Sequence, residues 1–261
     1  MENLGALAIL LAFCFAIYAL IGSIVGRLAR RPFLIQSGQR AVYTVWLLVT
    51  IAAGSLIYSI IAGDYRLAYV WETSNKTMPI QYKFAAWWGG QAGSLLFWSW
   101  LLSTYSAVVV FQNRKKFREM MPWVIVVLMS TQTFFLILNA FVVSPFKLLM
   151  AGKCVIDLGD GQGLNPLLQY WTMVIHPPML YLGYVGFAVP FAFAMGSLIT
   201  KQPGDACTCA PRPNVPPERS TASAPSTVSP RMFVLSPRVG KHPSAPKLFE
   251  CPPPQTRPDS P

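Results

Sequence analysis

The chain has 261 residues, of which 53% are hydrophobic and only 12% are charged, and its formal net charge is +11. This composition excludes an ordinary soluble domain and predicts an all-α integral membrane protein. The positive charge is divided between short loops and a tail, which favours attachment to an anionic membrane surface over nucleic-acid binding. We therefore expect the lipid bilayer, and not a nucleic acid, as a partner.

Five apolar stretches are long enough to cross a bilayer, which takes about 20 residues in a helix. They are residues 4–25, 42–61, 94–111, 121–143 and 179–199. The first stretch follows Glu2 and has its basic residues after it. That order is typical of a retained anchor rather than a cleaved signal peptide.

Basic residues orient the predicted bundle, because cytoplasmic loops are enriched in Lys and Arg. Two loops carry such clusters: Arg27, Arg30, Arg31 and Arg40 after the first stretch, and Arg114, Lys115, Lys116 and Arg118 beside Glu119 after the third. Both loops are predicted to be cytoplasmic. The N-terminus and the segments 63–93 and 144–176 then face outward, as in a multi-pass protein of a bacterial-type inner membrane.

The sequence changes character near Ala206, after which it is rich in Pro, Ser, Ala and Arg. Such a segment has too little apolar surface to offset the entropy lost on ordering. We expect a transmembrane domain over residues 1–200 and a disordered tail over residues 201–261. The tail is either a natural proline-rich segment that recruits a partner or an out-of-frame translation, and we favour the second interpretation for a reason given below.

The outward segment 63–93 leads into the motif KFAAWWGGQAGSLLFWSW. Trp87 and Trp88 fall where the chain is expected to meet the membrane interface. Gly89 and Gly90 permit close backbone approach or a positive φ. One interpretation is an aromatic belt followed by a turn, and the other is a flat apolar wall for a planar ligand.

His176, one of two histidines, lies in NPLLQYWTMVIHPPMLYLGYVGF. Pro177 disfavours a helical conformation of the residue before it, and Pro177 and Pro178 suit a first helical turn, so His176 is predicted at a helix N-terminus. The positive end of a helix dipole disfavours an imidazolium, and a neutral imidazole is the form that binds metals. With Trp171 and Tyr181 nearby, the setting suits one axial ligand of a haem iron. The alternative is an interfacial histidine that bonds to a loop carbonyl.

Three motifs together resemble the CcmF/NrfE/CcsA group of cytochrome c biogenesis proteins, which are haem lyase subunits: WWGGQAGSLLFW (87–98), NPLLQ (165–169) and HPPMLYLGYVGFAVPFAFA (176–194). The resemblance covers only the N-terminal part of such proteins and ends near Ala206. It implies a role in cytochrome c maturation. A b-type haem, transiently bound, would be received from a haem chaperone and presented on the periplasmic face for covalent attachment to apocytochrome c, with other maturation subunits in the membrane.

The resemblance also implies roles for particular residues. His176 would be the axial ligand of the haem iron, supported by the residues around it: Pro177, Pro178, Tyr181, Trp171, Trp87, Trp88, Gly89 and Gly90. Ala92 departs from the family pattern, which usually has a glutamate there, and no residue is assigned a catalytic role.

The family's tryptophan-rich outer loop and second outer histidine are not recognisable in this sequence. We therefore expect an incomplete haem site and a chain that is a poor or inactive haem lyase by itself. The same break favours a truncated or frameshifted product after Ala206. Two other functions remain as alternatives: a subunit of a small multi-pass transporter and a non-catalytic membrane scaffold.

Overall fold

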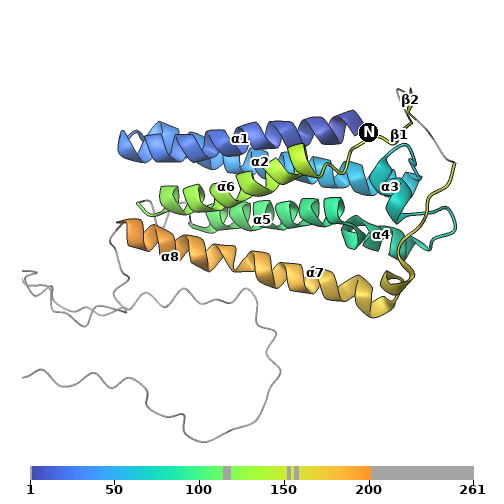
Figure 1. Ribbon diagram of the computed structural model, residues 1–261. Coiled ribbons are helices and arrows are strands. Elements are labelled where there is room, and N and C mark those ends of the chain that lie inside the picture. The colour runs from blue at the N-terminus through green and yellow to red at the C-terminus, as the bar shows by residue number, and fades with distance from the viewer. Residues whose placement is uncertain (1, 114–118, 152–153, 156–158, 201–261) are drawn as a thin grey trace, which may run out of the picture. The chain divides into compact units, whose positions relative to one another are not determined.

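The computed structural model describes residues 2–113, 119–151, 154–155 and 159–200 (Figure 1). The predicted disordered tail, residues 201–261, lies outside the described residues, as does the basic cluster 114–118. Every element described below therefore belongs to the predicted transmembrane domain.

The described chain is almost entirely helical. In chain order its helical elements are α1 (Glu2–Leu28), α2 (Pro32–Ala62), α3 (Ala68–Thr73), α4 (Ile80–Gly89), α5 (Gln91–Asn113), α6 (Met121–Ile137), the π-helical turn η1 (Leu138–Val142), the 3₁₀ turn η2 (Pro166–Leu168), α7 (Trp171–Gly186) and α8 (Ala188–Thr200). Two short strands, β1 (Met150–Ala151) and β2 (Cys154–Val155), pair in an antiparallel hairpin.

Five helical segments are long and apolar enough to cross a membrane, which confirms the predicted number. They are Asn3–Leu28, Pro32–Ala62, Gln91–Asn113, Met121–Val142 and Val174–Thr200. The second begins at Pro32 rather than at residue 42, so Arg40 lies within α2 and not in a loop. The apolar run is interrupted there by Gln36 and Arg40, but both are exposed and one helical turn apart, so the helix accommodates them on one face.

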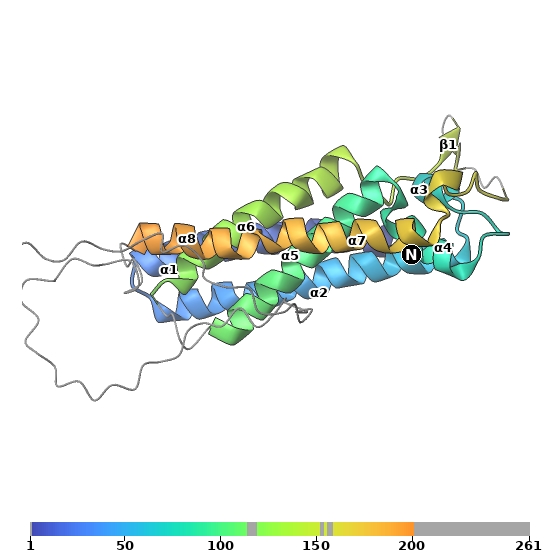
Figure 2. The ribbon, with the colours of Figure 1, turned by 90° about the horizontal axis from the view of Figure 1, so that it is seen from below.

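Helices α1, α2, α5 and α6 form a four-helix group in which α1 packs on α2 and α6, α2 on α5, and α5 on α6 (Figures 1 and 2). Small residues let these helices approach closely, as is common in membranes. A Cβ added to Gly38 of α2 would lie 2.8 Å from the Ser23 hydroxyl and 3.4 Å from the Ala19 carbonyl of α1. Inside the group, Gln132 of α6 is fully buried and donates to the Ser99 hydroxyl of α5 at 2.7 Å.

The segments between α2 and α5 and between α6 and α7 meet at one end of the helices, together with the start of α1 (Figures 1 and 2). We call the described residues of 63–90 and 144–170 the cap. The turn between α1 and α2 lies at the opposite end (Figure 1). At that end Arg27, in the last turn of α1, and Glu119, just before α6, form an ion pair of 3.9 Å, which joins two segments predicted to share one side of the membrane.

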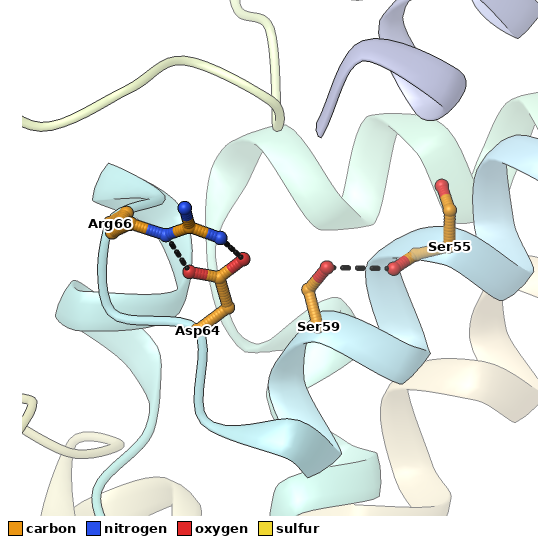
Figure 3. A network of polar contacts seen from close by, with 4 residues as sticks. All are labelled: Ser55, Ser59, Asp64 and Arg66. Atoms are coloured by element: carbon orange, nitrogen blue, oxygen red, sulfur yellow. Dashed lines mark hydrogen bonds and ion pairs between the residues drawn. The ribbon is translucent and has the colours of Figure 1, made fainter. Parts of the chain in front are cut away.

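Backbone hydrogen bonds fasten the two halves of the cap together. Leu67 and Leu148 form a β-bridge, flanked by the bonds from Ala68 N–H to the Lys147 carbonyl (2.9 Å) and from Leu149 N–H to the Arg66 carbonyl (2.7 Å). Arg66 also forms a two-pronged ion pair with Asp64, just after the end of α2 (Figure 3). In the last turns of α2, the Ser59 hydroxyl donates to the Ser55 carbonyl at 2.9 Å (Figure 3).

Helices α7 and α8 follow each other along one side of the group, with α7 against α5 and α8 against α6 (Figures 1 and 2). Together they supply the candidate span Val174–Thr200, and in an 18-residue apolar stretch of this span only 17% of the residues are buried within the described protein. We call this pair the α7–α8 arm. Its inner side includes Val185, Ala192 and Gly196, which are buried.

Candidate functional site

The junction between α4 and α5 faces α7 across a cavity of about 310 Å³. Ligand sites in proteins commonly measure about 300–1,000 Å³, so this cavity is at the small end of that range. Its lining comes from three parts of the chain that are distant in sequence: Ala85, Trp88, Gly89, Gly90, Gln91, Ser94, Leu164, Leu168, Pro177 and Tyr181. The structure thus brings together all three motifs that were singled out in the sequence.

The glycines of the WWGGQAG motif allow close packing. Helix α4 ends at Gly89 and α5 begins at Gln91, with Gly90 in an extended conformation between them. A Cβ on Gly89 would collide with the Leu164 side chain, and a Cβ on Gly93 would collide with the Trp87 carbonyl and the Tyr69 hydroxyl. The expected close approach is therefore present, whereas the positive-φ glycines of the described chain lie elsewhere, at Gly63, Gly159 and Gly163.

The two adjacent tryptophans have different surroundings. Trp87 is 4% exposed and packs edge-on against Phe97, with ring centroids 4.7 Å apart, and against Trp100 at 5.7 Å. Trp88 also contacts Phe97, at 5.7 Å, but it lines the cavity. Both tryptophans are buried, and of this pair Trp88 is the one that lines the cavity.

His176 does not lie at a helix N-terminus, so that prediction was wrong. Helix α7 begins at Trp171, and His176, Pro177 and Pro178 lie inside it. Prolines inside membrane helices are tolerated where neighbouring groups compensate for the lost N–H donors, and these two prolines remove bonds only to carbonyls of the first turn. Because the influence of a helix dipole falls off within the first turn, it is weaker at His176 than the sequence interpretation assumed.

The imidazole of His176 is exposed, on a side of α7 that the other described helices leave uncovered. Residues three, four or seven positions apart share a helix face. Four exposed residues lie on this face, which we call the His176 face: Thr172, His176, Met179 and Gly183. Nothing lies within 4 Å of a Cβ built on Gly183, so this face, from Thr172 to Gly183, is open along about three turns of the helix.

The predicted supporting residues are divided between the cavity and the surface. Trp88, Gly89, Gly90, Pro177 and Tyr181 line the cavity. Trp171 is 61% exposed at the start of α7. His176, Trp87 and Pro178 are not among the lining residues described. Since Pro177 lines the cavity and His176 precedes it on the helix, the cavity and the His176 face are adjacent but separate surfaces.

Side chains of the NPLLQ motif hold the part of the cavity lining formed by Leu164 and Leu168. The Asn165 side chain accepts a hydrogen bond from Leu167 N–H at 3.0 Å and so begins the 3₁₀ turn η2. The Gln169 amide donates to the Leu164 carbonyl at 2.7 Å. These bonds hold Leu164 and Leu168 at the cavity. The Asn-Pro pair is a recognisable start signal for a helical turn, so this role was available in the sequence.

Tyr69 of α3 was not singled out from the sequence. Its hydroxyl lies 2.9 Å from the Ala86 carbonyl and 3.1 Å from the Trp87 carbonyl, and it accepts a hydrogen bond from Gly90 N–H at 3.2 Å. Burial raises the pKa of Tyr69, so the phenol remains protonated and able to donate. A single tyrosine in a connecting segment gives no sequence signal for such a contact.

Within the part of the chain that the structure describes, no group of three or more His, Cys, Asp or Glu side chains gathers as in a metal site. A resident zinc or calcium centre of protein ligands is therefore not found there.

The sequence matches the family described as "Cytochrome C assembly protein" over residues 88–238. The chain belongs to the cytochrome c assembly protein family. The matched range begins at Trp88, includes His176 and extends past Thr200, the last described residue, to residue 238. The resemblance inferred from the three motifs is thereby confirmed at the level of the family.

Relatives agree with this assignment. The chain is 36% identical over 202 residues to "Cytochrome c-type biogenesis protein NrfE" of Haemophilus influenzae, covering 77% of this chain and 31% of the relative. It is 35% identical over 197 residues to "Cytochrome c-type biogenesis protein CcmF" of Pseudomonas aeruginosa, covering 76% of this chain and 29% of the relative.

A solved structure supports the same conclusion for the fold. The structure titled "Cytochrome c Heme Lyase CcmF" matches with a TM-score of 0.64 and 25% sequence identity, over 77% of this chain and 31% of that chain. The chain thus spans about a third of the length of the relatives that it matches. With its five candidate spans, this member of the cytochrome c assembly family is a multi-pass membrane protein.

Proposed function

We propose that this chain acts in cytochrome c maturation by binding haem through His176 and presenting it for covalent attachment to apocytochrome c. The observation that carries the proposal is the exposed imidazole of His176, on an uncovered face of a membrane-spanning helix and inside the range matched by the family. When bound, haem supplies the vinyl groups to which cysteine thiols of the client add.

The physical argument starts from the cost of a polar ring in apolar surroundings. An imidazole near a bilayer is costly unless it bonds to a partner, and ionisable side chains in membrane spans therefore usually have a function. Met179 and Gly183 share the face with His176. These two supply no strong donor or acceptor, and the hydroxyl of Thr172, the remaining residue of the face, makes no hydrogen bond to the ring in the described part of the chain. An external partner therefore best satisfies the ring, and a haem iron accepts one neutral imidazole nitrogen.

The rest of the site holds the helix that carries His176. Tyr181 packs against Phe97 at 5.9 Å and against Trp98 at 5.2 Å. One residue further, the Leu182 carbonyl accepts a hydrogen bond from the Tyr105 hydroxyl of α5 at 3.1 Å. These contacts fix the rotation of α7 about its axis, and hence the direction in which His176 points.

The proposed partners follow from this role. We infer a haem chaperone and an apocytochrome c at the periplasmic face, where the cap would lie, and other maturation subunits within the inner membrane. The basic residues near the opposite end, among them Arg27, Arg30 and Arg31, support a cytoplasmic position for that end. The transporter alternative receives less support, because Arg27 and Arg40 are the charged residues of the five candidate spans and both lie toward that same end.

The proposal is tested by titrating the purified full chain in lipid nanodiscs with ferric haem b. His176→Ala is expected to raise the dissociation constant at least about tenfold, which is about 1.4 kcal/mol, and to remove the absorption band of imidazole-ligated haem. Free imidazole added to this variant should restore the band, because it replaces the missing ligand.

His242→Ala is the matched control, since it removes the other histidine of the chain. It is expected to bind haem as the wild type does. Because the His176 side chain is exposed, His176→Ala should unfold at the temperature of the wild type. Equal haem affinity and equal spectra in the wild type and His176→Ala would overturn the proposal.

A further inference from the structure

We propose that Tyr69 is the positioning residue of the cavity: its hydroxyl ends α4 at Gly89 and thereby fixes the wall that Trp88 and Gly90 present to α7. The inference deepens the proposed function and rests on it in one respect, because haem affinity is one of the two readouts of its test. The other readout needs no haem.

The hydroxyl of Tyr69 is inserted into the last turn of α4. In a continuing helix, Gly90 N–H would donate to the Ala86 carbonyl four residues earlier. Here Gly90 N–H donates to the Tyr69 hydroxyl instead, and that hydroxyl lies 2.9 Å from the same Ala86 carbonyl. One side-chain oxygen therefore replaces one backbone hydrogen bond, which separates α4 from α5 at Gly90.

The Tyr69 hydroxyl has to replace this backbone hydrogen bond because the junction is buried. The last carbonyls of a helix have no partner within it and usually turn to water or to a capping group. Ala86 is 0% exposed and Trp87 is 4% exposed, so solvent does not reach them. Tyr69, itself 6% exposed, is the side chain that serves both carbonyls.

The glycine spacing of the motif provides room for the Tyr69 ring. A Cβ on Gly90 would lie 2.9 Å from Tyr69 Cε2, and a Cβ on Gly93 would collide with the Tyr69 hydroxyl. Two of the motif's three glycines therefore accommodate this one tyrosine. These positions therefore need glycine for an internal contact with Tyr69, and not only to leave room for a ligand in the cavity.

Tyr69 also connects the cavity to the far half of the cap. It belongs to α3, whose first residue, Ala68, is bonded to Lys147 across the β-bridge. Within α3, the Thr73 hydroxyl donates to the Tyr69 carbonyl at 2.7 Å. The segment after α6 thus sets the position of the Tyr69 hydroxyl. The hydroxyl in turn sets the position of the α4–α5 junction, which forms the cavity wall.

The test compares Tyr69→Phe, which keeps the ring and deletes the hydroxyl, with the wild type in nanodiscs. Hydrogen exchange of the Gly90 amide should accelerate at least tenfold, because its acceptor is lost. Because α4 packs against α7, the helix that carries His176, loss of the fixed wall should raise the dissociation constant for ferric haem b about threefold or more. The bound haem should keep the imidazole-ligated spectrum because His176 is intact. This combination separates a positioning role from a ligating one.

Tyr18→Phe is the matched control, because it deletes a hydroxyl that lies 2.8 Å from the Ser37 hydroxyl, between α1 and α2 and outside the cavity lining. It should leave both readouts unchanged. Gly93→Ala, which displaces the Tyr69 hydroxyl without deleting it, should also accelerate exchange at Gly90 and keeps the inference testable if Tyr69→Phe does not fold.

If hydrogen exchange of the Gly90 amide is unchanged in Tyr69→Phe, the inference is overturned. If haem binding depends on His176, the inference is also overturned by a Tyr69→Phe variant whose Gly90 exchange is faster but whose haem affinity is unaltered. If His176→Ala binds haem as the wild type does, the proposed function fails. In that case the cavity is probed with a neutral maleimide instead of haem. The maleimide alkylates the thiol of a Ser94→Cys variant, and its rate is measured with and without Tyr69→Phe. A rate that Tyr69→Phe leaves unaltered overturns the inference.

Discussion

The four-helix group and the α7–α8 arm cross the membrane in different ways. In an 18-residue apolar stretch of each candidate span, the share of buried residues is 33% for α1, 44% for α2, 56% for α5 and 39% for the segment formed by α6 and η1, against 17% for the arm. Inside the group the Gln132 amide donates to the Ser99 hydroxyl, whereas the buried Oε1 of Gln132 has no hydrogen-bond partner among the described residues. The arm is fixed along one side only, and His176 lies on its open side. Residues that stabilise the fold and the residue proposed to bind haem are thus largely in different helices.

The largest effect is expected from deleting core volume in the group and not in the arm. Leu128 of α6 is 1% exposed, so Leu128→Ala should lower the free energy of unfolding by about 2–5 kcal/mol. Phe187, which is 73% exposed beside the arm's helix junction, should lose no more than about 0.5 kcal/mol on Phe187→Ala. Equilibrium unfolding in detergent measures both, and similar losses would show that the arm is packed as tightly as the group.

The second-largest effect is expected from a pair of glycine variants, one in the four-helix group and one in the α7–α8 arm. Gly93→Ala forces a methyl group against the Trp87 carbonyl and the Tyr69 hydroxyl, and overpacking of this kind costs about 1–3 kcal/mol. Gly183→Ala in the arm meets nothing within 4 Å and should be neutral or stabilise the helix by up to about 1 kcal/mol. Thermal unfolding of the two variants measures both changes in stability. If Gly183→Ala lost as much stability as Gly93→Ala, the His176 face would not be open.

The smallest effect is expected in the cap, whose stability should fall at low pH. Hydrogen bonds from the backbone N–H groups of Lys76 (2.9 Å) and Gly161 (2.8 Å) hold the pKa of Asp160 below its usual value of 3.8. A lowered pKa in the folded state means that the carboxylate stabilises the cap above about pH 4, and that this contribution is lost as the pH falls through the folded-state pKa.

Amide exchange at Lys76 and Gly161, corrected for its intrinsic pH dependence, should therefore accelerate below about pH 4 while the arm is unaffected. Asp160→Asn should accelerate the same amides at neutral pH and remove the acid dependence. An Asp160→Asn variant that retains the acid transition would assign it to another group.

The sequence was sufficient to predict the five spans and the family, because long apolar runs and the HPP motif are local signals. Its errors came where local rules compete with the bilayer. The start of α2 was missed because Gln36 and Arg40 break the apolar run, yet both are exposed on one helix face. His176 was assigned to a helix N-terminus because proline usually ends or begins helices in water, whereas α7 continues through both prolines.

The cavity was beyond local reasoning for a different reason. Its walls come from residues near positions 88, 164 and 177, and its junction is set by Tyr69, which is 17 residues from Ala86 in sequence. No periodicity or motif pairs these positions. The motifs identified the right segments, but only the three-dimensional arrangement separates the cavity from the His176 face.

The bonds across the cap also imply an order of assembly. Lys76 and Asp160 are 84 residues apart, and α5 and α6 lie between them. Contacts of such long sequence separation form late, because the loop that they close must first be organised. Both intervening helices must have entered the bilayer before the two halves of the cap can meet. The cavity is therefore absent from the growing chain until residues 164–181 emerge.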